Sequence, residues 1–185
     1  MSIFTEIGGR MFQLVIAPLH NPSMLWAAVP LMASLAIITF YYAKYPEEEQ
    51  GWENAVSNTL VLIFVGVDLL RYVYTNPQVE DIIRLSGIPL PAKTFAALLV
   101  LFLGVSLLVI TYNHIHAKGV TFAFASPVTV NVMAYVAMAV VYSNIALDYR
   151  TLLAGIVMGL IIYIIVKLAI RGMPKKLFWL GKKRK

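Results

Sequence analysis

The sequence predicts an all-α fold, a polytopic helical membrane bundle of about five transmembrane helices preceded by an interfacial helix. Of the 185 residues, 60% are hydrophobic and only 13% are charged, against roughly 25% charged in a soluble domain. The apolar residues form continuous blocks of roughly 20, enough to cross about 30 Å of hydrocarbon as helix. Because these blocks do not alternate in polarity, membrane β-strands are excluded.

Residues 1–20 predict an amphipathic helix that lies in the membrane interface. Its apolar side chains share one helical stripe: Phe4, Ile7, Met11, Leu14 and Val15. Its polar side chains share the opposite face: Glu6, Arg10 and Gln13. A cleaved signal peptide is not expected, since the basic residue stands well upstream of the apolar block and no small-residue cleavage site follows.

Residues 21–171 form the predicted transmembrane domain. Its five spans are expected at residues 24–43, 54–74, 92–112, 126–147 and 151–170. Tyr and Trp residues gather near the expected ends, as amphipathic rings do at the headgroup level. Between the second and third spans, residues 78–86 predict either a short surface helix or an irregular loop, because nine residues make a marginal helix.

Residues 172–185 form a basic tail, and it predicts a cytoplasmic C-terminus with the N-terminus outside. Eight of the 15 Lys and Arg residues lie between positions 167 and 185. The Lys and Arg residues of the loops favour the opposite orientation. We give more weight to the tail because its positive charges are dense, and we therefore expect the C-terminus in the cytoplasm. Anchoring to anionic lipid headgroups, rather than binding to nucleic acid, is expected of its basic and aromatic residues: Lys175, Lys176, Trp179, Lys182 and Lys183.

Charged residues stand at the ends of the second and fourth predicted spans. Asp68 and Arg71 are three residues apart and can meet on one helix face. Asp148 and Arg150 end the fourth span on the same side of the bundle, so a cluster of all four is expected. Ion pairing that locks helices together is the favoured interpretation, and uptake of a proton or cation at Asp68 is the alternative.

Polar side chains are also expected together on the opposite side: Asn54, Asn58, Asn131 and His114. Interhelical hydrogen bonding is the simpler interpretation, and a hydrophilic vestibule for a small solute is the alternative. His114 and His116 point about 200° apart on a helix, so they cannot chelate one metal ion there. Facing histidines on two spans, which haem would need, are absent from the predicted spans. We therefore expect neither a metal nor another cofactor.

Gly155 and Gly159 form a GxxxG pattern on the fifth span. Two glycines one turn apart let another helix approach closely. The partner is expected within the chain itself; a second subunit or a homodimer contact is the alternative.

No motif names a reaction: the sequence lacks a phosphate loop, a GxSxG, an HExxH and any cysteine. The leading hypothesis is a non-enzymatic accessory or assembly subunit of a complex, integral to the cell membrane. The second is a transporter or channel for a small solute or ion, which would use the polar residues of the second span. The third is a membrane-embedded enzyme acting on lipid.

Overall fold

The computed structural model describes residues 3–45, 51–75, 92–143 and 145–172. Its regular structure within those ranges is entirely helical, which confirms the all-α prediction. In chain order the helices are α1 (Ile3–His20), α2 (Pro22–Lys44), α3 (Trp52–Thr75), α5 (Ala92–Tyr112), α6 (Lys118–Phe124), α7 (Pro127–Tyr142) and α8 (Tyr149–Gly172). The expected helix or loop at residues 78–86 and the basic residues 173–185 fall outside the described residues.

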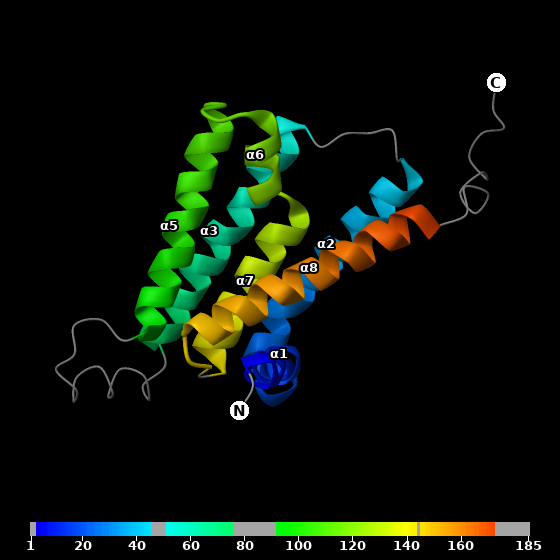
Figure 1. Ribbon diagram of the computed structural model, residues 1–185. Helices are drawn as coiled ribbons and strands as arrows, with labels where there is room; N and C mark the ends of the chain where they lie inside the picture. The colour runs from blue at the N-terminus through cyan, green and yellow to red at the C-terminus, as the bar shows by residue number, and fades with distance from the viewer. Residues whose placement is uncertain (1–2, 46–50, 76–91, 144, 173–185) are drawn as a thin grey trace, which may run out of the picture.

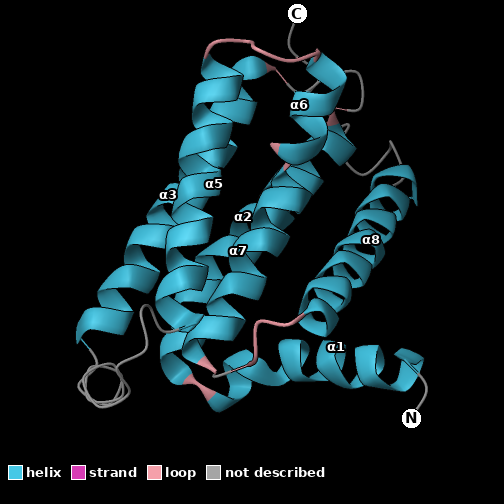
Figure 2. Cartoon of the chain, turned by 60° about the vertical axis from the view of Figure 1, so that its left-hand side comes forward, coloured by secondary structure: helices cyan, strands magenta, loops and turns pink. Residues whose placement is uncertain are grey.

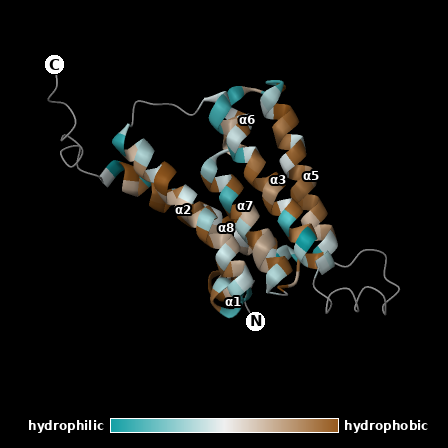
Figure 3. Cartoon of the chain, turned by 180° about the vertical axis from the view of Figure 1, so that it is seen from behind, coloured by the Kyte–Doolittle hydropathy of each residue, from teal (hydrophilic) through white to brown (hydrophobic). Residues whose placement is uncertain are grey.

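Five segments among the described residues are long and apolar enough to cross a membrane: Pro22–Lys44, Trp52–Thr75, Lys93–Tyr112, Lys118–Tyr142 and Tyr149–Gly172. They run up and down in turn, so the bundle has two ends (Figure 1). The first end, called the α1 end, holds α1, the starts of α2, α5 and α8, and the last turns of α3 and α7. The other, called the α6 end, holds α6 and the opposite helix termini. Figure 3 shows hydrophobic residues predominating along α5 and much of α3.

The fourth segment differs from the expected span at residues 126–147. The structure breaks the helix at Ser126, whose side chain accepts a hydrogen bond from the Thr129 N–H at 3.2 Å. Together with Pro127 in the first turn, this cap starts a new helix, because proline at that position loses no helical hydrogen bond. The apolar stretch before the break forms α6, so the segment begins at Lys118 and ends at Tyr142.

Helices α3 and α5 approach each other closely at two glycines. A Cβ placed on Gly66 would lie 2.8 Å from the Leu101 Cα, and one placed on Gly104 would lie 2.9 Å from the Ile63 nitrogen. Those positions must therefore be glycine for the two backbones to come this close.

Helix α7 is the centre of the bundle, since it contacts α2, α3, α5 and α8. Its last turns are almost wholly buried, including Ala137, Met138, Val140 and Val141. Helices α2 and α8 contact each other and lean away from α3 and α5 toward the α6 end (Figure 1). Much of their surface is consequently exposed and apolar.

Helix α1 lies across the α1 end of the bundle (Figure 2). Leu14 and Ala17 of this helix are buried against the bundle, and the Tyr135 hydroxyl of α7 donates to the Leu14 carbonyl at 2.9 Å. Asn21 then starts α2: its side-chain oxygen accepts from the Ser23 N–H at 3.1 Å, while its amide nitrogen donates to the Tyr142 carbonyl at 2.6 Å. This residue therefore joins the α1–α2 junction to the end of α7.

Candidate functional site

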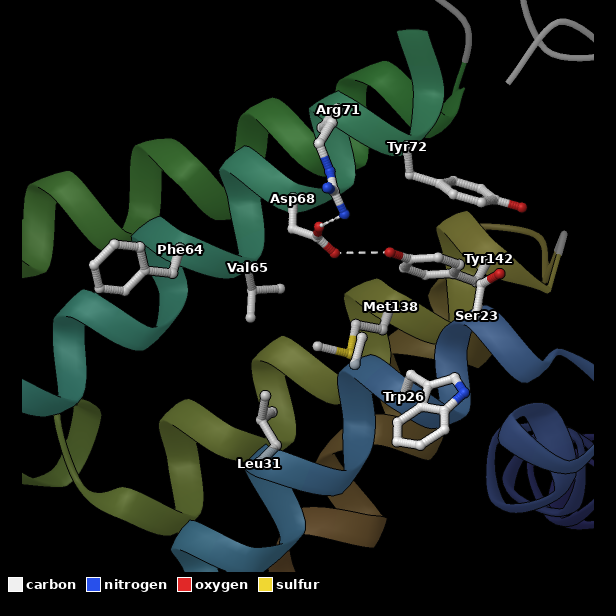
Figure 4. Close-up of a pocket in the computed structure, with 11 residues that line it drawn as sticks. Ser23, Trp26, Leu31, Phe64, Val65, Asp68, Arg71, Tyr72, Met138 and Tyr142 are labelled. Atoms are coloured by element: carbon white, nitrogen blue, oxygen red, sulfur yellow. Dashed lines mark hydrogen bonds and ion pairs between the residues drawn. The ribbon is translucent and has the colours of Figure 1, made fainter. Parts of the chain in front are cut away.

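Asp68, Arg71 and Tyr142 form a hydrogen-bonded network near the α1 end (Figure 4). Asp68 Oδ1 accepts from Arg71 Nη2 at 2.7 Å, and Asp68 Oδ2 accepts from the Tyr142 hydroxyl at 2.7 Å. The Tyr72 ring packs on the Tyr142 ring with centroids 4.1 Å apart. Opposite charge and a hydroxyl donor thus stabilise the carboxylate in a site where the Asp68 side chain is 31% exposed.

This network borders a cavity of about 610 Å³ between α2, α3 and α7, called the α2–α3–α7 cavity. Its polar or amphipathic lining residues are Ser23, Trp26, Asp68, Arg71, Tyr72 and Tyr142. Its purely apolar lining residues are Ala27, Leu31, Phe64, Val65 and Met138. Figure 4 shows side chains from all three helices around this space.

The four-residue cluster expected from the sequence is divided in two. Asp148 Oδ2 binds Arg10 Nη2 at 3.2 Å, and Arg150 Nε binds Glu6 Oε2 at 3.2 Å. Neither Asp148 nor Arg150 lines the cavity beside Asp68. The two residues instead hold α1 against the start of α8.

Sequence reasoning missed the partners on α1 because it placed Glu6 and Arg10 on the polar face of an interfacial helix and assigned them no partner in the bundle. In the structure the outward residues include two from the expected apolar stripe, Phe4 and Val15, which are 81% and 58% exposed. The packed part of that stripe is Ile7, Met11 and Leu14. Helical periodicity identified an apolar face without showing how much of it the bundle covers.

Asp148 also caps α8, since its Oδ1 accepts from the Thr151 N–H at 2.8 Å. That backbone hydrogen bond lowers the pKa of the Asp148 carboxyl. Partial burial acts in the opposite direction, and the Arg10 guanidinium adds to the lowering. Asp148 therefore remains ionised at neutral pH and can hold both α8 and α1.

The amides expected together on the side opposite the charged cluster, with a vestibule as the alternative interpretation, bind groups near the α6 end. Asn58 donates to the Ala125 carbonyl at 2.8 Å and Asn131 to the Pro127 carbonyl at 2.7 Å, both beside the break between α6 and α7. Asn54 reaches the Tyr42 hydroxyl at 3.5 Å. None of the three lines either the α2–α3–α7 cavity or the groove on the other side of α7. The contacts of Asn58 and Asn131 secure the helix break, whereas Asn54 joins α3 to α2.

His114 lies flat on the Trp52 ring, with centroids 3.9 Å apart. Its φ of 52° places it in the left-handed region, where it turns the chain after α5. His116 is exposed nearby. Within the described residues, no three His, Asp or Glu side chains are grouped in a way that could hold a metal ion.

Gly155 and Gly159 face α7 within the same chain. A Cβ on Gly155 would lie 3.0 Å from Val136 Cγ2, and one on Gly159 would lie 3.4 Å from Val132 Cγ1. Beside this contact, an apolar groove of about 690 Å³ runs between α5, α7 and α8 and is called the α5–α7–α8 groove. The two glycines line it together with Val132, Val136, Leu152, Ile156, Leu160 and Tyr163, among others.

The comparisons with known proteins add no family to this description. The chain matches no family model, and neither the curated proteins nor the solved structures yielded a match.

Proposed function

We propose that this chain is an integral membrane protein that acts without catalysis, as an accessory or assembly subunit that holds a transmembrane helix of another protein. The observation that carries the proposal is the α5–α7–α8 groove. It follows α8 from Leu152 to Tyr163, a length of roughly 17 Å or three turns of helix. That is long enough to seat a substantial part of one apolar helix.

The lining of the groove suits helix packing. Of the described residues that line it, only Thr129 and Tyr163 have polar side chains, so a ligand would gain dispersion contacts and few hydrogen bonds. Gly155 and Gly159 already pack against Val136 and Val132 of α7, so a partner helix would contact the larger apolar side chains of the groove, such as Ile156 and Leu160. Among the described residues, no carboxylate, histidine or lysine lines the groove, so acid–base catalysis there has no support.

The outer part of α8 extends the apolar surface beyond the groove. Its exposed residues include Ile161, Ile164, Ile165 and Leu168. Helix α2 has similar exposed residues: Met32, Ile37 and Phe40. The lipid chains of a bilayer would cover these side chains. An apolar transmembrane helix of a partner subunit could pack on them in place of lipid without burying a polar group.

The orientation we propose places the α6 end in the cytoplasm. Three arginines at the α1 end face carboxylates: Arg10 with Asp148, Arg71 with Asp68, and Arg150 with Glu6. The sequence of residues 171–185 contains seven Lys and Arg residues and no acidic residue. The density of Lys and Arg directly after the last span supports retention of the tail inside.

Tryptophan substitutions in the groove test the subunit role. Ile156→Trp and Leu160→Trp place bulk in the groove from positions that are 60% and 58% exposed. Ile165→Trp is the control, since Ile165 is 58% exposed on α8 and does not line the groove. The full chain is extracted from its native membranes in a mild detergent and sized by light scattering. We expect a defined complex with a second membrane protein, which the two groove variants lose and the control retains.

Two outcomes would overturn this role. One is a monodisperse monomer from native membranes for the unsubstituted chain. The other is loss of a bound phospholipid, and of no protein, from the groove variants by native mass spectrometry.

Transport through the polar residues of α3 has weaker support. Asn58 and Asp68 are ten residues apart, about 15 Å along a helix. Between them Leu62 and Val65 are buried, and Gly66 lies against the backbone of α5. A solute path along this face would have to separate packed helices.

A further inference from the structure

The α2–α3–α7 cavity has a gradient of polarity along the bundle. On α2, Ser23 and Trp26 stand in the first turns, whereas Leu31 lies eight residues beyond Ser23, about 12 Å deeper along a helix. The direction of the gradient is from polar at the α1 end to apolar toward the middle.

The other two helices repeat this order. On α3, Arg71 and Asp68 lie nearer the α1 end than Val65, and on α7 Tyr142 is one turn nearer than Met138. Three independent helices therefore place polar groups at one level and apolar groups deeper. A molecule that matches the whole cavity must have a polar head and an apolar chain.

The polar level carries one charge of each sign with unused hydrogen-bonding capacity. An ionised carboxylate has about four acceptor positions, and Asp68 uses two within the described residues. A guanidinium has five N–H donors, and Arg71 uses one there. The Arg71 side chain is 73% exposed, so its remaining donors are accessible.

The presence of both Asp68 and Arg71 determines which kind of polar head group the cavity can bind. An anionic head would meet Asp68 and a cationic head would meet Arg71, so each would experience one repulsion. A head with both charges avoids this: its phosphate can bind the arginine fork, and an ammonium with N–H donors can bind the carboxylate. Trp26 is 79% exposed at the same level and offers an aromatic face to the ammonium.

We propose that the α2–α3–α7 cavity binds one zwitterionic phospholipid with a primary ammonium head, of the phosphoethanolamine class. Its phosphate binds Arg71, its ammonium binds Asp68, and the start of an acyl chain lies along Leu31, Val65 and Met138. The volume of about 610 Å³ falls within the roughly 300–1,000 Å³ of small-molecule sites. The site lies on the other side of α7 from the α5–α7–α8 groove and goes beyond the proposed subunit role.

The test uses the full chain, purified and delipidated in a maltoside detergent. Four probes are titrated: short-chain phosphatidylethanolamine, phosphatidylglycerol, phosphatidylcholine and water-soluble O-phosphoethanolamine. Binding is measured by native mass spectrometry and by thermal shift. We expect phosphatidylethanolamine to bind at least tenfold more tightly than the other two lipids, and O-phosphoethanolamine to bind negligibly because it lacks the chain.

Arg71→Gln should weaken phosphatidylethanolamine binding at least tenfold, and Arg71→Lys should weaken it less because the charge remains. Arg150→Gln is the matched control, since Arg150 is an ion-paired arginine at the same end that does not line the cavity. Asp68→Asn should reduce the preference for phosphatidylethanolamine over phosphatidylglycerol. Equal affinity for all three lipids, equal effects of the Arg71 and Arg150 substitutions, or tight binding of O-phosphoethanolamine would each overturn the proposal.

Discussion

Replacing Gly66 by alanine tests the close contact between α3 and α5. The added methyl would lie 2.8 Å from both the Cα and the Cβ of Leu101 and 2.9 Å from its backbone nitrogen. Carbon atoms pack best at about 3.5–4.0 Å. The Leu101 backbone cannot rotate aside as a side-chain end would, so α5 must shift as a unit.

The expected magnitude follows from two opposing effects. Overpacking of a tight contact costs about 1–3 kcal/mol, whereas replacing a helical glycine by alanine gains about 1 kcal/mol in helix propensity. Gly159→Ala is the matched control, because its methyl would lie at an ordinary 3.4 Å from Val132 Cγ1. The propensity gain is common to both, so the difference in unfolding free energy should be about 1–3 kcal/mol, with Gly66→Ala the less stable.

Unfolding of each variant is followed by far-ultraviolet circular dichroism in mixed micelles as the fraction of dodecyl sulfate rises. The result that would refute the reasoning is a difference below about 0.5 kcal/mol, the usual range for substitutions without packing consequences. Such a result would mean that α3 and α5 are farther apart in solution than the structure places them.

The remaining predictions concern the Asp68–Arg71–Tyr142 network and the ion pair between Arg10 and Asp148. Asp68→Asn should lower the thermal stability of the detergent-solubilised chain more than it changes cation flux into liposomes, and unchanged melting with lost flux would reverse that conclusion. Tyr142→Phe should cost about 1.5–3 kcal/mol in the same melting assay, the net value of a hydrogen bond to a charged group, and should cost less once Asp68 is already Asn. Folding lowers the pKa of Asp148, so its ionised carboxylate stabilises the fold above the unfolded pKa near 3.9, and this stabilisation is lost as the pH falls through the lower folded pKa. The difference in unfolding free energy between the wild type and Asp148→Asn should therefore shrink over that acidic range. A difference that does not depend on pH would contradict the assigned role of Asp148. Arg10→Gln should speed hydrogen exchange of the α1 amides, and high salt should abolish the difference in exchange rate from the wild type. Equal exchange rates in low salt would contradict the conclusion that the Arg10–Asp148 ion pair holds α1 against α8.

Much of the fold was readable from the sequence because it depends on local properties. A segment that crosses lipid as a helix satisfies its own backbone hydrogen bonds, so apolar blocks of the right length suffice to predict it. Four of the five expected segments agree with the described helices to within two residues at each end. The i, i+3 spacing of Asp68 and Arg71 predicted their contact for the same local reason.

Contacts between helices were not readable in this way. Sequence reasoning could have found Tyr142, because it lies in the last turns of the expected fourth span, near the expected level of Asp68, and its hydroxyl is a donor that a carboxylate can accept from. Gly66 and Gly104 had no comparable signal, because neither belongs to a GxxxG pattern. Their meeting depends on how α3 and α5 are rotated about their axes.

By itself the sequence determined that this chain forms apolar helices long enough to span a membrane and that charged residues stand near their ends. Only the tertiary structure decided that Arg10 and Glu6 reach the start of α8, that α6 and α7 share one segment, and that two cavities flank α7. The physical reason is that a helix that is apolar on nearly all sides has no distinct face that marks where its neighbours pack. Its rotation and its neighbours are set by close packing and a few polar contacts, which residue spacing along the chain does not encode.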